Sequence, residues 1–176
     1  MAVGMSLFLF ILPAPPLVLL SFAVIFTSSF MLHELAHKLT AQHHGLWAEF
    51  RITLIGALVT LLSIFSPLKI ISPGAVMIAG SGSEKTLGKV SLAGPLVNLL
   101  LSATFVGVSM FSADYLFLIA VLSGFFNASI ALINLIPLGI LDGLKVFGWN
   151  KTIWAAAFLS SLTLFIWAFI HVEGLF

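Results

Sequence analysis

His33, Glu34 and His37 form the pattern His-Glu-x-x-His inside a very apolar part of the sequence. Residues four positions apart lie on one face of a helix, so a helical motif directs both imidazoles toward the same Zn²⁺. Glu34 lies one step around such a helix, where it can take a proton from a water molecule without binding the metal itself. Two nitrogen ligands, a position for water and a nearby carboxylate are the groups that a zinc hydrolase needs.

The hydrophobic run at 17–32 leads directly into this motif. An ionisable residue within a membrane helix costs about 2.5–3.5 kcal/mol on insertion scales, so its presence indicates a function. The alternative interpretation is a helix whose polar side chains line a solvated groove or an ion path. A single His-Glu-x-x-His pattern in a charge-rich soluble protein would be much weaker support for a metal site.

The composition indicates an integral membrane protein. The chain has 176 residues, of which 61% are hydrophobic and 7% are charged, and its mean hydropathy is +1.23, whereas soluble domains carry about 25% charged residues. One helical bundle accounts for this length, so we expect residues 1–176 to form a single domain. A net charge of +1 does not suggest nucleic acid as a partner. The absence of cysteine excludes disulfides and thiolate ligands.

Hydropathy and Pro/Gly positions predict the order of the elements. We expect helices over 17–43, 91–111, 115–136 and 152–170, strands over 46–54 and 74–80, a polar loop over 80–89, and a short amphipathic piece at 145–151. Residues 1–10 lack the basic flank of a signal peptide, and the apolar stretch 3–12, which prolines interrupt, is too short to cross a bilayer. The predicted fold class is an all-α polytopic membrane protein, with about 4–6 transmembrane helices and a small membrane-dipping β element.

A catalytic zinc normally has a third protein ligand. The residue types that can supply it are found at Asp142, His43, His44, His171, Glu173, Asp114 and Glu49. Asp142 is favoured because it follows a predicted helix that is broken by Pro137 and Gly139. Broken backbone at membrane depth is tolerated where it is buried in protein or lines a cavity, and an acid placed there is a functional candidate.

Topology sets a condition on this choice. For Asp142 to meet His37, the segment 46–90 must begin and end on the same side of the membrane, so 55–72 should dip into the bilayer and return. With that path, the basic residues other than Lys69 face one side: Lys38, Arg51, Lys85, Lys89, Lys145 and Lys151. The positive-inside rule makes this side cytoplasmic. We therefore expect a multi-pass protein of the cell membrane with its active site toward the cytoplasm.

Three motifs in this order resemble the site-2 protease family of intramembrane zinc metalloproteases. They are His-Glu-Leu-Ala-His at 33–37, Gly-Pro-Leu-Val-Asn at 94–98, and Asn-Leu-Ile-Pro-Leu-Gly-Ile-Leu-Asp-Gly at 134–143. The third pattern is the most specific, because unrelated metalloproteases share the first. The chain resembles a minimal form of the family without a PDZ or CBS domain, and its N-terminal region is shorter than a full spanning helix.

The resemblance implies a role for each matched residue. His33, His37 and Asp142 would bind zinc, and Glu34 would be the general base and then the acid. Asn134 would lie near the scissile carbonyl or the oxyanion, and Asn98 would support the site or the substrate. The family also uses short membrane-dipping strands to hold an extended substrate, and 46–54 and 74–80 resemble them.

The partners implied are a transmembrane protein substrate and the lipid bilayer, and a homo-oligomer is compatible with the sequence. Two other classes of protein stay open: a zinc-binding membrane protein that does not cleave, and a structural membrane subunit. Asn127 lies seven residues before Asn134, on the same helix face, and is expected mainly to form hydrogen bonds between helices.

Overall fold

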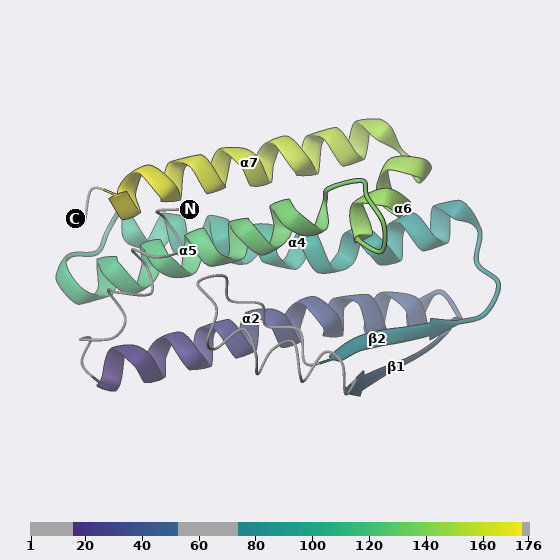
Figure 1. Cartoon of the computed structure of the whole chain (residues 1–176), viewed down its shortest axis with the longest axis horizontal. Coiled ribbons are helices and arrows are strands. Elements are labelled where there is room, and N and C mark those ends of the chain that lie inside the picture. Colours follow the sequence, from purple (N-terminus) through teal and green to yellow (C-terminus); the bar gives the residue numbers. More distant parts are fainter. Residues whose placement is uncertain (1–15, 53–73, 174–176) are drawn as a thin grey trace.

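The computed structural model describes residues 16–52 and 74–173. The proline-rich N-terminal segment and the predicted re-entrant segment 55–72 lie outside the described residues. Within them the chain forms five helices and two strands (Figure 1). Their bounds are α2 Pro16–His43, β1 Trp47–Ile52, β2 Gly74–Ala79, α4 Glu84–Ser109, α5 Asp114–Asn134, α6 Asp142–Trp149 and α7 Lys151–Glu173. The predicted fold class, helical with a small β element, is confirmed.

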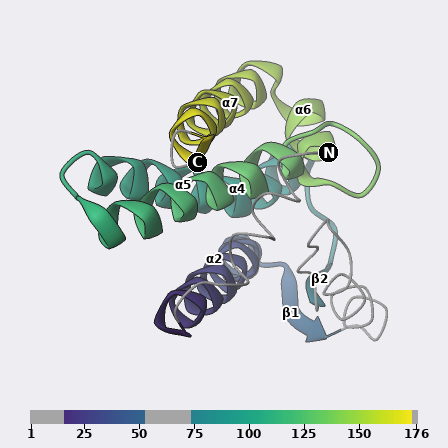
Figure 2. The same cartoon turned by 60° about the vertical axis from the view of Figure 1, so that its left-hand side comes forward.

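The antiparallel pair α4 and α5 forms the middle layer of the bundle. Helix α7 lies on one side of this pair, and α2 with the two strands lies on the other (Figures 1 and 2). The interface between α4 and α5 is lined by small buried residues, including Ser102, Gly124 and Ala131. Small side chains let helix backbones approach closely, which is how helices pack where lipid offers no hydrophobic driving force.

Three of the described helices, α4, α5 and α7, are long and apolar enough to cross a bilayer. Large hydrophobic side chains on them point outward, for example Leu100 at 61% exposure and Ile170 at 60%. A soluble protein would place such side chains inside, so this surface fits a lipid environment. The predicted total of about 4–6 crossings stays a prediction, because it includes segments outside the described residues.

The sheet begins directly after α2. Gly45 has a φ of 74°, a left-handed conformation that glycine adopts without strain, and it ends the helix where the sequence predicts. Strands β1 and β2 are antiparallel, with Trp47 opposite Ala79 and Ile52 opposite Gly74. Both strands contact α2. The two predicted strands are therefore confirmed, and they lie beside the helix that carries the His-Glu-x-x-His motif.

The predicted polar loop over 80–89 is wrong in its second half. Helix α4 begins at Glu84, seven residues before the predicted start, and the Ser83 side chain caps it by accepting a hydrogen bond from the Thr86 N–H at 3.2 Å. A serine cap followed by an acid in the first turn is a favourable helix start. The charged residues of this segment therefore form the end of a membrane helix that extends beyond its apolar part.

Candidate metal centre

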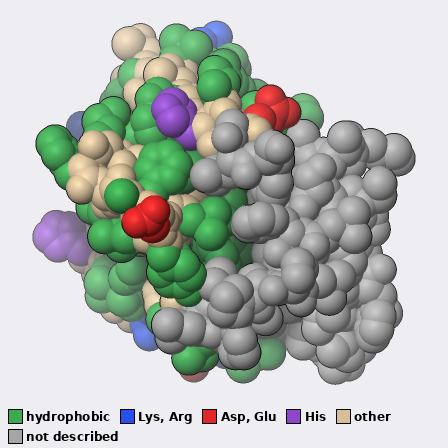
Figure 3. All heavy atoms as spheres, turned by 90° about the vertical axis from the view of Figure 1, so that its left-hand side faces the viewer, with side chains coloured by type: hydrophobic (Ala, Val, Ile, Leu, Met, Phe, Trp, Pro, Cys, Tyr) green, Lys and Arg blue, Asp and Glu red, His purple; other side chains and the backbone are tan. Residues whose placement is uncertain are grey.

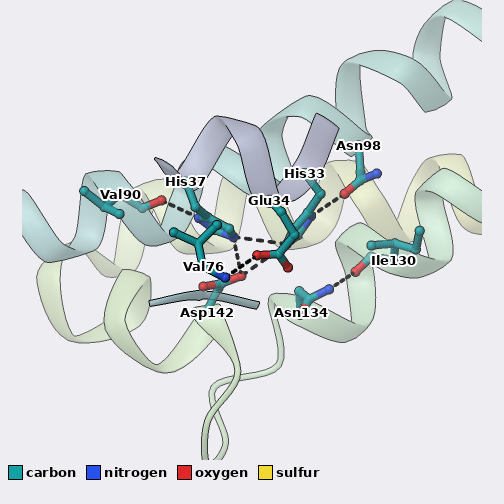
Figure 4. A network of polar contacts seen from close by, with 9 residues as sticks. All are labelled: His33, Glu34, His37, Val76, Val90, Asn98, Ile130, Asn134 and Asp142. Carbon is teal, nitrogen blue, oxygen red and sulfur yellow. Dashed lines mark hydrogen bonds and ion pairs between the residues drawn. The ribbon is translucent and has the colours of Figure 1, made fainter. Parts of the chain in front are cut away.

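His33 and His37 lie on successive turns of α2 and are both buried. Their ring centroids are 4.7 Å apart, and their Nε2 atoms approach to 3.1 Å. The Nδ1 atom of His33 is 2.5 Å from the Asn98 Oδ1, and the Nδ1 of His37 is 2.7 Å from the backbone oxygen of Val90 (Figure 4). Residues of α4 therefore contact the Nδ1 atom of each ring, which we call the outer nitrogen. The two Nε2 atoms, the inner nitrogens, face each other.

These contacts determine which nitrogen carries the proton in the neutral rings. Both partners of the Nδ1 atoms are oxygen acceptors, so Nδ1 is the N–H donor in His33 and in His37. The Nε2 atoms then present lone pairs to the space between the rings. A histidine that donates its second N–H to a protein oxygen is the usual arrangement of a metal-binding imidazole.

Asp142, the first residue of α6, brings a carboxylate to the same space. Its Oδ2 lies 3.1 Å from the His37 Nε2 and 3.6 Å from the His33 Nε2. A carboxylate binds a metal in its ionised form and an imidazole in its neutral form, so this set of groups has the residue types of a metal site.

The three inner atoms fit a zinc ion. The two Nε2 atoms and a carboxylate oxygen of Asp142 all lie within 4.8 Å of one another, and a metal cation placed among them would offset the repulsion between two nitrogen lone pairs and a carboxylate. A tetrahedral zinc with bonds of about 2.0–2.2 Å places its ligand atoms about 3.3–3.6 Å apart, and the separations here are 3.1, 3.1 and 3.6 Å. The assignment of His33, His37 and Asp142 as ligands stays a prediction, and their geometry agrees with it.

Gly94 makes room for this arrangement. A Cβ atom at position 94 would overlap with the Nε2 atoms of both His33 and His37. Helix α4 can therefore approach the two rings closely only because residue 94 has no side chain. Gly143 plays the same part for Asp142, since a Cβ at position 143 would overlap with the Leu135 carbonyl at the end of α5.

Comparison with known proteins agrees with this chemistry. The chain is 34% identical over 132 residues to a protein of Methanocaldococcus jannaschii named "Putative zinc metalloprotease MJ0611", covering 73% of this chain and 69% of the archaeal protein. The chain belongs to this zinc metalloprotease family. No family model matches the sequence, and no solved structure matches it.

The general base predicted for this metalloprotease, Glu34, lies at the same centre. Its Oε2 accepts a hydrogen bond of 2.9 Å from the backbone N–H of Val76 in β2 (Figure 4). Because this N–H points away from β1, Val76 and Phe50 form a non-hydrogen-bonded pair of the two-stranded ladder. The edge of β2 that does not pair with β1, its outer edge, therefore faces Glu34 and the cluster of His33, His37 and Asp142, which we call the metal group.

The two predicted asparagines have different surroundings. Asn98 is fully buried and contacts His33 directly, so it lies where a supporting residue is expected. Asn134 is the last residue of α5, and its amide nitrogen donates to the Ile130 carbonyl of its own helix at 3.0 Å. The predicted role of Asn134 at the oxyanion stays a prediction.

Three of the other candidate ligands, Glu49, His44 and His171, have polar partners away from this centre. Glu49 pairs with Arg51, two residues along the same exposed face of β1. The Nδ1 of His44, just beyond the end of α2, is 2.9 Å from the Thr40 carbonyl in the last turn of that helix, and the Nδ1 of His171 is 2.7 Å from the Trp167 carbonyl in its own helix. Sequence reasoning missed the backbone groups of Val76 and Val90, because a main-chain donor or acceptor has no signature in the residue type.

Proposed function

We propose that this metalloprotease belongs to the site-2 protease type and hydrolyses peptide bonds in or next to the transmembrane segments of membrane proteins. The observation that carries the proposal is the convergence of His33, His37 and Asp142 with Glu34 beside them, in a bundle of membrane-length helices. The sequence relation to a zinc metalloprotease and the order of the three motifs support it.

Each residue has a distinct task in the proposed reaction. His33, His37 and Asp142 would hold zinc, which when bound polarises the peptide carbonyl and makes water more acidic. Glu34 removes a proton from the attacking water as the water oxygen bonds to the carbonyl carbon. Glu34 then delivers this proton to the amide nitrogen as the carbon–nitrogen bond breaks. Asn134 would donate to the developing oxyanion, a contribution of about 3–4 kcal/mol when the donor is well placed.

The outer edge of β2 supports the proposal that the substrate binds as an extended strand. In an antiparallel strand alternate residues share a direction, so the backbone groups of Gly74 and Ile78 point the same way as those of Val76. A helical substrate has its carbonyls bonded within the helix and must unwind before water can attack. Strand addition supplies replacement hydrogen bonds for the unwound segment.

The test is cleavage of a single-span substrate by the detergent-solubilised protein, with and without a chelator. The variant Glu34→Gln keeps the shape of the side chain but cannot take a proton, so we expect cleavage to fall by about 10²–10⁴-fold while zinc content is unchanged. Glu84→Gln is the matched control, because it removes an exposed acid at the start of α4.

Equal cleavage rates for Glu34→Gln and the parent protein, at equal zinc content, would overturn the proposed mechanism. Zinc bound stoichiometrically by a parent protein that cleaves no membrane substrate would instead favour a zinc-binding membrane protein without protease activity. Restoration of cleavage by zinc after chelation is expected, because the ligands lie on elements that are already packed together.

A further inference from the structure

A buried chain of hydrogen bonds connects His33 to α5 through two asparagine side chains. Beyond the contact between His33 and Asn98, the Asn98 Nδ2 donates to the Asn127 Oδ1 at 2.9 Å. The Asn127 Nδ2 donates in turn to the Ser123 carbonyl at 2.9 Å and to the Ser29 Oγ at 3.1 Å. Asn98 and Asn127 are 0% exposed. This hydrogen-bond chain therefore connects α2, α4 and α5 in a region that water does not reach.

The donors and acceptors of this hydrogen-bond chain can be assigned from one group, the Ser123 carbonyl. The Ser123 carbonyl can only accept a hydrogen bond, so the amide nitrogen of Asn127 must face it. The Asn127 oxygen is then directed at Asn98, and it requires the Asn98 nitrogen opposite it. The Ser29 hydroxyl can donate or accept, so it adds a contact without choosing the direction.

The orientation of the Asn98 amide in turn determines which His33 nitrogen carries the proton. With its nitrogen turned toward Asn127, Asn98 presents its oxygen to His33, and the His33 Nδ1 must carry the proton. A reversed Asn98 amide would donate to that Nδ1, and the neutral ring would then carry its proton on Nε2. Reversal would also place two amide oxygens against each other in a buried site, which is costly.

We infer that Asn127 is a positioning residue that fixes the tautomer of His33, and so keeps its Nε2 available to zinc, by orienting the Asn98 amide. The inference rests on the proposed zinc site. The tautomer of His37 does not depend on an orienting side chain, because its Nδ1 donates directly to the Val90 carbonyl, which can only accept. The two ligands on α2 therefore differ in how their tautomers are determined.

The test uses the variant Asn127→Leu, whose side chain has the same number and branching of heavy atoms but no polar group. Zinc affinity is measured by competition with a chromophoric chelator, and we expect the zinc Kd to rise about 10–100-fold, the usual effect of losing a group that orients a metal ligand. Ser102→Ala is the matched control. It removes a buried hydrogen bond of 2.9 Å to the Gly124 carbonyl, between the same two helices, without touching the chain to His33.

A second control changes a residue of the hydrogen-bond chain, Ser29. Ser29→Ala removes one acceptor of the Asn127 amide but leaves the Ser123 carbonyl, so the direction is preserved. We expect the zinc Kd of Ser29→Ala and of Ser102→Ala to stay within about threefold of the parent value, well below the effect of losing an orienting group. A Kd for Asn127→Leu in the same range would overturn the inference.

The tautomer is read directly by ¹⁵N NMR of histidine-labelled, metal-free protein at alkaline pH, where the rings are neutral. We expect a protonated Nδ1 for His33 and His37 in the parent, and a mixture of tautomers for His33 alone in Asn127→Leu. A parent His33 protonated on Nε2 would overturn the inference even if the variant failed to fold. Because no metal is present, this measurement tests Asn127 separately, whereas a parent protein that binds no zinc would contradict the proposed function.

Discussion

Each histidine of the metal group uses one ring nitrogen for a protein oxygen and directs the other toward Asp142. At this scale the environment of a side chain matters as much as its type. A metal-binding histidine usually donates its other ring N–H to a protein oxygen or water, and here α4 provides both acceptors. Gly94 permits the contact, because α4 meets the two rings at a residue without a side chain.

We predict that Gly94→Ala weakens zinc binding by at least about tenfold, because the added methyl group overlaps with the two Nε2 atoms and must displace the rings. Gly107→Ala is the control on the same helix, since a Cβ at position 107 meets no atom within 4 Å. Zinc content and chelator competition measure the difference. Equal zinc affinity in the two variants would show that the rings are not held as described.

At the scale of elements, Asp142 reaches the histidines because α6 begins against the end of α5. Pro137 and Gly139 lie in the turn between the two helices, and Gly139 has a φ of 57°. The freed carbonyl of Leu135 accepts a hydrogen bond of 2.7 Å from the indole N–H of Trp154 in α7. One carbonyl freed by the break in the helix is thus satisfied by a neighbouring helix, as backbone polar groups within a membrane protein need to be.

The close contact between α6 and α5 yields a second paired prediction. Gly143→Ala places a methyl group against the Leu135 carbonyl and moves α6, so we expect Asp142 to withdraw and zinc affinity to fall by at least about tenfold. Gly148→Ala lies in the same short helix, where a Cβ meets no atom within 4 Å, and it should leave zinc affinity unchanged. Tight zinc binding by Gly143→Ala would indicate that Asp142 does not depend on this contact.

At the scale of the whole molecule, the basic residues within the described ranges and the metal group lie on elements that meet toward one end of the bundle. The C-terminus of α2, the N-termini of α4 and α7, and all of α6 are found together at the right-hand end of Figure 1. The opposite end, which faces the viewer in Figure 3, shows mainly hydrophobic side chains among the described residues. From the positive-inside rule we propose that the end with these basic residues faces the cytoplasm.

This orientation is testable with single cysteines, because the chain has none of its own. Lys85→Cys lies in the first turn of α4, and Phe111→Cys lies just beyond its last turn at a position 93% exposed. On intact cells we expect a membrane-impermeant maleimide to label Phe111→Cys only, with Lys85→Cys labelled after permeabilisation. The cysteine-free parent is the control, and the reverse labelling pattern would place the site on the outer side.

The sequence by itself determined the membrane class, the helix that carries His33 and His37, the two strands, and the choice of Asp142. These follow from hydropathy, from four-residue spacing and from Pro/Gly positions, all of which are local properties of the chain. The resemblance in three motifs added Asn98 to this set. The start of α4 was misplaced because charged residues at a helix end resemble those of a loop.

Only the tertiary structure decided which groups meet across the helices. The Val76 N–H that holds Glu34 is 42 residues away in sequence, and the Val90 carbonyl that holds His37 is 53 residues away. The direction of the chain from Ser123 through Asn127 and Asn98 likewise depends on how α4 and α5 face each other. A buried hydrogen bond is set by the relative position of two packed elements, and residue types alone do not determine that position.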